Sequence, residues 1–169
     1  WADADGPSAA LEQLIDATGI SRIAPSIVLD ETMRTDFSLL LLDALPGAKR
    51  RFTQDTVGYL RSRKDEDEYR RLKAAHLLND RAVEAAFAAL KPGMTAIEVA
   101  SFISDFYKAN GATTEFCSVC FGPNGAFPHH HTGTTPLKTG DAVLIDTGCR
   151  LDGYPSDMTR MGYLGSAPE

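Results

Sequence analysis

The chain has 169 residues, of which 43% are hydrophobic and 24% are charged, and its net charge is −6. This composition is typical of a folded globular protein and argues against intrinsic disorder. The negative charge disfavours a nucleic-acid partner, because binding to the phosphate backbone requires a basic surface. No apolar run approaches the roughly 20 residues that cross a bilayer, so we expect no membrane partner either.

The first part of the chain alternates between helical and extended patterns. Helical spacing of apolar residues predicts one helix between Ser8 and Gly19. A second predicted helix opens at Thr35 or Asp36 and is ended by Pro46 and Gly47. Ile20–Leu29 and Arg50–Asp55 have the composition of strands, the first of them interrupted by a proline. This alternation predicts a small α/β unit, incomplete at its start, in which no cluster of ligands or nucleophiles stands out.

The second part begins with the almost wholly charged stretch Arg61–Glu68, which opens a predicted long helix that continues to Leu90. Thr95–Glu98 has the pattern of a capping box and opens a further helix, which Asn110 and Gly111 end. A strand is predicted over Thr113–Phe121. The predicted apolar face of the long helix consists of Leu72, Ala75, Ala82, Val83, Ala86, Phe87 and Leu90.

The three cysteines form an odd set, which does not suggest a disulfide framework and favours a reducing cytoplasm. Cys117 and Cys120 make a CxxC pattern inside the predicted strand. Residues three apart on a strand point to opposite faces, and redox pairs usually stand at the start of a helix. We therefore interpret both thiols as small buried side chains rather than as a redox or zinc motif.

The last part of the chain predicts a hairpin, with strands over Asp141–Arg150 and Tyr154–Tyr163 joined through Asp152 and Gly153. A two-residue Asp-Gly turn makes Asp146 and Asp157 diagonal neighbours, and a slightly longer turn makes them direct partners. Both registers place the two carboxylates on one face of the sheet.

Two carboxylates this close repel each other unless something positive lies between them. Asp146 also interrupts an apolar run, where an unpaired acid is costly. Two interpretations stay open at this point, a metal-binding pair and a hydrogen-bonded structural pair. Oxygen ligands without thiolates favour a hard or borderline divalent ion such as manganese or magnesium over structural zinc.

His129, His130 and His131 follow Pro128 in a predicted loop. Three adjacent rings cannot all point at one site, so we expect at most one or two of them to act. An imidazole close to a metal site can donate a hydrogen bond to a developing oxyanion or shuttle a proton.

Several motifs in this region occur together: the GPN loop, the Pro-His pair, GDxVLIDxG and GYxSDxTR, with eleven residues from the first aspartate to the second. In this combination the sequence closely resembles the pita-bread metallopeptidase family, in its branch of Xaa-Pro dipeptidases and aminopeptidase P. The resemblance implies an α/β (α+β) chain. Residues 1–60 would be the latter part of a small creatinase-like N-terminal domain, and residues 61–169 the first half of a pita-bread catalytic domain.

The resemblance also implies roles for single residues. Asp146 matches the first metal-ligand aspartate, and Asp157 matches the second, which bridges two divalent ions with manganese as the favoured metal. His129 matches the histidine that contacts substrate and helps to stabilise the tetrahedral intermediate, whereas His130 and His131 receive no role. The family completes its five-ligand site with a histidine and two glutamates that this sequence lacks, so we expect a truncated chain that is inactive on its own.

The implied reaction is hydrolysis of Xaa-Pro bonds in proline-containing peptides or dipeptides, by an Xaa-Pro dipeptidase or an aminopeptidase P that forms a homodimer in the cytoplasm. Thr159 and Arg160 are expected to support the ligands rather than to act directly. The alternative is a metal-free relative that serves as a binding or interaction module. Such relatives tend to lose their ligand aspartates, and both aspartates are present here.

Overall fold

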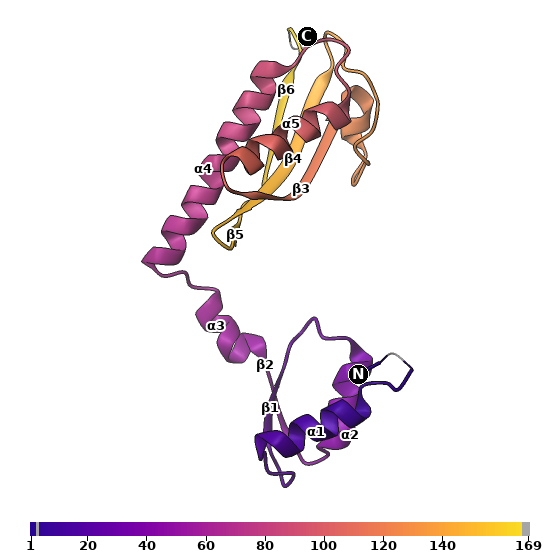
Figure 1. The fold of residues 1–169 in the computed structure, drawn as a ribbon, viewed down its shortest axis with the longest axis vertical. Coiled ribbons are helices and arrows are strands. Elements are labelled where there is room, and N and C mark those ends of the chain that lie inside the picture. The colour runs from indigo at the N-terminus through magenta and orange to yellow at the C-terminus, as the bar shows by residue number, and fades with distance from the viewer. Residues whose placement is uncertain (3, 167–169) are drawn as a thin grey trace. The chain divides into compact units, whose positions relative to one another are not determined.

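The computed structural model describes residues 1–2 and 4–166, and Figure 1 shows its helices and strands. The chain divides into two compact units, Trp1–Lys64 and Asp65–Glu169. Both units mix helices and strands, as the α/β (α+β) class requires. None of the helices in the part of the chain that the structure describes is long and apolar enough to cross a membrane.

The first unit has a small core of Ile15, Ile27, Leu29 and Leu45. Its elements are α1 (Ser8–Thr18), β1 (Ser26–Leu29), α2 (Thr35–Ala44), β2 (Lys49–Phe52), the 3-10 helix η1 (Thr53–Asp55) and α3 (Val57–Arg61). β1 and β2 pair in parallel. Helix α1 ends at Gly19 in the left-handed conformation, with φ 64°, as the sequence predicts.

Two predicted strands of the first unit are shorter than expected. Residues 20–25 lie outside β1, because the Ser21 side chain closes a local turn by accepting a hydrogen bond from the Ile23 amide at 3.1 Å. The other strand, β2, ends at Phe52, and the 3-10 helix η1 follows from Thr53.

The second unit is an antiparallel sheet with two helices. Its elements are α4 (Glu66–Ala89), α5 (Ala96–Ala109), β3 (Thr113–Phe121), the 3-10 helix η2 (Gly122–Ala126), β4 (Ala142–Leu151), β5 (Tyr154–Pro155) and β6 (Met158–Tyr163). Strand β4 is central, since it pairs with β3 on one side and with β5 and β6 on the other. Residues of both helices pack with inward-facing side chains of β3 and β4, among them Val119, Val143 and Ile145, to form the main core.

Helix α4 begins later than the charged stretch suggested. Its cap is Asp65, whose carboxylate accepts a hydrogen bond from the Glu68 amide at 2.9 Å, while the Glu68 carboxylate accepts one from the Asp65 amide at 3.0 Å. This reciprocal pair is a capping box, and it ends the non-helical segment after α3. The capping box predicted for α5, between Thr95 and Glu98, is confirmed.

The hairpin closes through the shorter of the two predicted turns. Asp152 and Gly153 both have positive φ, 49° and 82°, as a two-residue hairpin turn demands. In the resulting register Leu151 pairs with Tyr154, and Asp146 pairs with Thr159.

The predicted second strand of the hairpin is interrupted at Ser156 and Asp157, which separate β5 from β6. The Ser156 hydroxyl accepts a hydrogen bond from the Cys149 amide at 3.0 Å, so a side chain takes the place of a backbone carbonyl in the ladder. Gly148 makes the close approach possible, because a Cβ atom there would lie 2.1 Å from the Ser156 carbonyl oxygen.

A buried polar side chain connects the helices to this interruption. Asn79 of α4 is fully buried and donates hydrogen bonds to the Thr147 carbonyl at 2.8 Å and to the Ser156 hydroxyl at 3.2 Å. The Tyr107 hydroxyl of α5 donates to the Asn79 side-chain oxygen at 2.7 Å. The predicted apolar face of α4 did not include this position.

We predict that Gly148→Ala destabilises the protein by about 1–3 kcal/mol or more, because the new methyl group overlaps the Ser156 carbonyl and the Phe116 ring. Urea unfolding followed by circular dichroism measures the change. Gly133→Ala is the matched control, since its Cβ atom would lie 3.8 Å from the nearest oxygen, in ordinary contact. Equal unfolding midpoints for the two variants would contradict the prediction.

Burial raises the pKa of the Tyr107 phenol above its ordinary value. Because the folded state holds this proton more tightly than the unfolded state does, the protonated phenol stabilises the fold. This contribution to the free energy of unfolding is fully present below about pH 10 and is lost as the pH rises further. Tyr107→Phe should cost about 1–3 kcal/mol at neutral pH, since the Asn79 oxygen loses its donor. In urea titrations, the difference in free energy of unfolding between Tyr107→Phe and the unaltered protein should shrink above about pH 10. A difference that stays constant with pH would refute this prediction.

Candidate functional site

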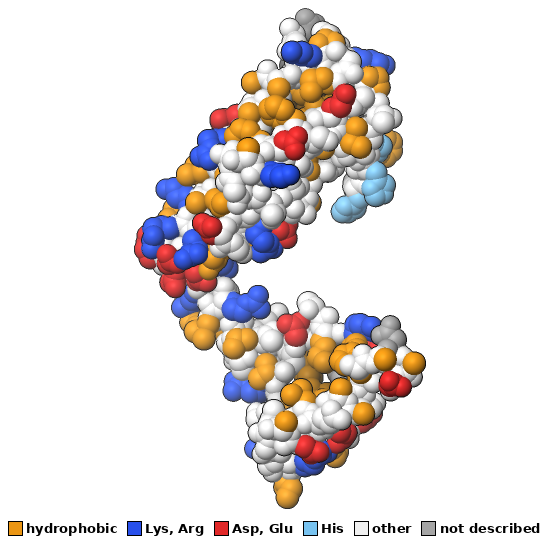
Figure 2. All heavy atoms as spheres, viewed as in Figure 1, with side chains coloured by type: hydrophobic (Ala, Val, Ile, Leu, Met, Phe, Trp, Pro, Cys, Tyr) orange, Lys and Arg blue, Asp and Glu red, His pale blue; other side chains and the backbone are white. Residues whose placement is uncertain are grey.

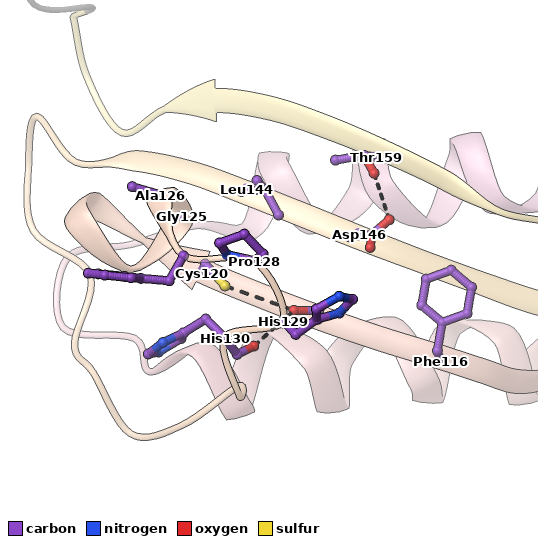
Figure 3. A pocket seen from close by; sticks show the side chains of 12 residues that line it. Phe116, Cys120, Gly125, Ala126, Pro128, His129, His130, Leu144, Asp146 and Thr159 are labelled. Carbon is purple, nitrogen blue, oxygen red and sulfur yellow. Dashed lines mark hydrogen bonds between the residues drawn. The ribbon is translucent and has the colours of Figure 1, made fainter.

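A pocket of about 460 Å³ lies over the sheet of the second unit (Figure 3). Side chains alternate along a strand, so the residues of β3 and β4 that do not enter the core face this pocket. Phe116, Ser118 and Cys120 come from β3, and Leu144 and Asp146 come from β4. Thr159 of β6 and the loop residues 125–130 complete the lining.

Asp146 enters the pocket because of this alternation. Its neighbours Ile145 and Thr147 are buried on the helix side, while Asp146 is half-buried on the other side. The Thr159 hydroxyl donates a hydrogen bond to Asp146 Oδ1 at 2.6 Å. Among the residues that the structure describes, Thr159 is the one side-chain donor to this carboxylate, and Oδ2 has no protein donor. The acid that interrupted the apolar run therefore lies on the surface of a pocket.

Asp157 lies in the interruption between β5 and β6 and is exposed, although its neighbours Ser156 and Met158 are buried. The observed register makes it a diagonal neighbour of Asp146 rather than its direct partner, since Asp146 pairs with Thr159. Asp157 does not line the pocket. Within residues 4–166 its carboxylate has no side-chain hydrogen bond or ion pair.

The backbone separates the three histidines. His129 and His130 line the pocket, whereas His131 does not. Figure 3 shows the His129 ring on the side of the loop that faces Phe116 and Asp146, and the His130 ring turned to the other side. The His130 ring lies 6.5 Å from the ring of Phe127, centroid to centroid. The structure thus brings His129 and Asp146 into one pocket, and Asp157 is not among the residues that line it.

His129 has φ 58°, a left-handed backbone conformation that is uncommon for residues other than glycine. Its side chain is exposed, and histidine side chains gather on the surface of the second unit in Figure 2. Two side chains hold the loop in place. The Thr132 hydroxyl accepts a hydrogen bond from the Val119 amide at 2.8 Å, and Asn124 of the GPN motif donates to the Thr135 hydroxyl at 3.2 Å.

The two CxxC cysteines face opposite sides of β3, as the sequence predicts. Cys117 packs against the core, Cys120 lines the pocket, and both are free thiols. Burial raises the pKa of the Cys117 thiol, which disfavours the thiolate needed for metal binding or redox chemistry.

Asp146 and Asp157 are suitable ligands for a hard divalent ion, because such ions prefer carboxylate oxygens. The half-buried Asp146 carboxylate, with one oxygen held by Thr159 and the other without a protein donor, has the arrangement of an oriented ligand. These two side chains alone are too few to hold a metal ion tightly, however. In the described part of the chain, no three histidine, cysteine, aspartate or glutamate side chains gather closely enough to hold a metal ion.

Comparison with known proteins finds peptidases that match nearly the whole chain. YkvY of Bacillus subtilis, whose name proposes a dipeptidase, is 36% identical over 162 residues, which are 95% of this chain and 44% of that protein. The dipeptidase PepE of Mycobacterium ulcerans superposes with a TM-score of 0.83 at 32% identity, over 99% of this chain and 44% of that one. A prolidase of Thermococcus sibiricus superposes with a TM-score of 0.82 at 28% identity, over 99% and 46%.

The chain therefore spans slightly less than half the length of these relatives. The superpositions confirm the predicted α/β (α+β) class and its likeness to the pita-bread fold of these relatives. Residues 70–169, more than half of the chain, match the metallopeptidase family M24. This match shows that the chain belongs to metallopeptidase family M24.

Proposed function

We propose that the full-length protein is a metal-dependent peptidase that hydrolyses Xaa-Pro bonds, as an Xaa-Pro dipeptidase or an aminopeptidase P. This chain would carry part of the site. The observation that carries the proposal is the pocket shared by Asp146 and His129, in which Thr159 orients one oxygen of the carboxylate. The prolidase and dipeptidase names among the relatives support the same reaction class.

In this proposal Asp146 and Asp157 are metal ligands, and the Thr159 hydrogen bond fixes the direction of the Asp146 carboxylate. Two divalent ions, with manganese as the proposed metal, would supply Lewis acidity and a nucleophile at neutral pH. The remaining histidine and glutamate ligands would come from polypeptide that this chain does not include. His129 would donate a hydrogen bond to the oxygen of the scissile carbonyl as negative charge develops there.

The pocket lining supports a proline-containing peptide as substrate. An amide bond to proline has no N–H, so recognition depends on the carbonyl group and on the apolar ring. Phe116, Phe127 and Leu144 give the pocket apolar walls next to Asp146 and His129. This surface would accept the ring, while the two polar side chains would face the carbonyl.

Other features of the whole protein are also proposals. We propose that residues 1–60 form the creatinase-like domain and residues 61–169 the first half of the catalytic domain. We further propose a homodimer, a cytoplasmic location and no nucleic-acid or membrane partner. The net charge of −6 favours the absence of a nucleic-acid partner.

A metal-free relative that acts as a binding or interaction module is the second candidate. The described residues contain no cluster of three metal-ligating side chains, which agrees with either candidate because the proposed metal site takes further ligands from outside this chain. The two candidates differ in whether the full-length protein binds a divalent ion, so metal analysis separates them.

We predict that Asp157→Asn in the full-length protein abolishes manganese-dependent hydrolysis of an Xaa-Pro dipeptide, because the neutral amide is a poor ligand for a hard cation. Asp152→Asn is the matched control. It removes the same charge in the Asp-Gly turn, where φ is 49° and asparagine is well tolerated. Full turnover by the Asp157 variant, measured by release of free proline, would refute the ligand assignment.

Removal of metal provides a second test. We expect dialysis against a chelator to reduce hydrolysis of the dipeptide to background and addition of Mn²⁺ to restore it. Hydrolysis that survives complete removal of metal, verified by elemental analysis, would contradict metal dependence. A protein that binds no divalent ion and hydrolyses no Xaa-Pro peptide would instead support the binding module.

A further inference from the structure

The two segments that carry the candidate ligands meet at one buried side chain. Asn79 donates one hydrogen bond to the carbonyl of Thr147, the residue after Asp146, at 2.8 Å. It donates a second one to the hydroxyl of Ser156, the residue before Asp157, at 3.2 Å. A single amide group therefore holds the residue adjacent to each aspartate.

The orientation of this amide is fixed by its surroundings. Its oxygen accepts a hydrogen bond from the Tyr107 hydroxyl at 2.7 Å, so its nitrogen has to face Thr147 and Ser156. The Tyr107 hydroxyl also lies 3.2 Å from the Thr147 hydroxyl, which in turn donates to the Phe116 carbonyl at 3.0 Å. Asn79, Tyr107 and Thr147 are all fully buried, and no buried side-chain polar atom among the described residues lacks a partner.

The hydrogen bond from Asn79 to the Ser156 hydroxyl is important because regular backbone pairing with β4 is interrupted at Ser156 and Asp157. Ser156 replaces regular pairing with its own side chain, which accepts a hydrogen bond from the Cys149 amide at 3.0 Å, while its amide donates to the Cys149 carbonyl at 2.7 Å. The register is the same on both sides of the interruption, since Arg150 pairs with Pro155 and Thr147 pairs with Met158. Asp157 follows Ser156 directly and is exposed, so the contact at Ser156 fixes the backbone next to this carboxylate. Asn79 stabilises the irregular geometry from the core side.

We propose that Asn79 is a positioning residue for the half-site formed by Asp146 and Asp157. Its two hydrogen bonds set the spacing between the strand that carries Asp146 and the interruption that carries Asp157, and Tyr107 locks the amide in the orientation that makes both bonds. This inference rests on the proposed function, since it assigns the spacing to the binding of a divalent ion. Partners that orient ligands in this way typically change metal affinity by about 10–100-fold when they are removed.

A buried asparagine also contributes to stability, so the test has to separate positioning from folding. Asn79→Leu has similar size and removes both hydrogen bonds. Asn79→Asp keeps the shape but replaces the donor with an acceptor that faces the Thr147 carbonyl. Ile103→Ala in α5 is the control, because Ile103 is fully buried in the same core and makes none of these hydrogen bonds.

The experiment uses the full-length protein and Co²⁺ as the probe, with binding followed by visible absorption and by calorimetry. We expect both Asn79 variants to bind Co²⁺ about 10–100-fold more weakly and to show a changed absorption spectrum. With Mn²⁺ they should lower kcat while KM changes little. Ile103→Ala should be destabilised in urea and keep the Co²⁺ affinity and spectrum of the unaltered protein.

The outcomes distinguish this inference from the proposed function. If the Asn79 variants bind Co²⁺ as tightly as Ile103→Ala does, Asn79 is structural only and the inference is overturned, while the proposed function stands. If the unaltered protein binds no Co²⁺ and is inactive with Mn²⁺, the proposed function fails and the inference fails with it. Should Asn79→Leu not fold, Tyr107→Phe replaces it, with a smaller loss of Co²⁺ affinity expected and an unchanged affinity overturning the inference.

Discussion

The close packing of β4 against Ser156 is the constraint on which the second unit depends. The Ser156 carbonyl occupies the place of a side chain at Gly148, and its hydroxyl bonds the Cys149 amide. This contact interrupts the hairpin between β5 and β6 and brings Ser156 within reach of Asn79 on α4. The glycine of the GDxVLIDxG motif is therefore explained by a close approach of backbone, because its φ does not require a glycine. Sheet, helix and candidate ligands are linked at this one point.

Much of this arrangement could be predicted from the sequence where the determining interactions are local. The Thr95 and Glu98 capping box, the Gly19 helix end and the two-residue turn at Asp152 all involve residues within a few positions of one another. The shared face of the sheet predicted for Asp146 and Asp157 likewise followed from the alternation of side chains along paired strands. The family resemblance added what spacing could not supply, namely the roles of Asp146, Asp157 and His129.

The features that could not be predicted depend on contacts between residues far apart in the chain. Asn79 appeared as a polar residue within an amphipathic pattern, and its partners, Tyr107, Thr147 and Ser156, lie on three other segments. The break at Ser156 was missed for the same reason, because composition alone favours one continuous strand over Tyr154–Tyr163. A signal did exist, since a polar residue on the buried face of a helix is costly unless it finds partners.

Few side chains compensate the charges of the two aspartates in the described part of the chain, which agrees with the proposed role of both as metal ligands. A structural pair would be stabilised by a nearby basic side chain or by several hydrogen bonds. Arg160 is close in sequence, but its guanidinium lies 3.2 Å from Asp80 on α4 and so is paired elsewhere. Within the described residues Asp146 has the Thr159 hydroxyl alone as a side-chain donor, and Asp157 has none. In the proposed function, a divalent ion would supply the positive charge that the described residues do not provide to these two carboxylates.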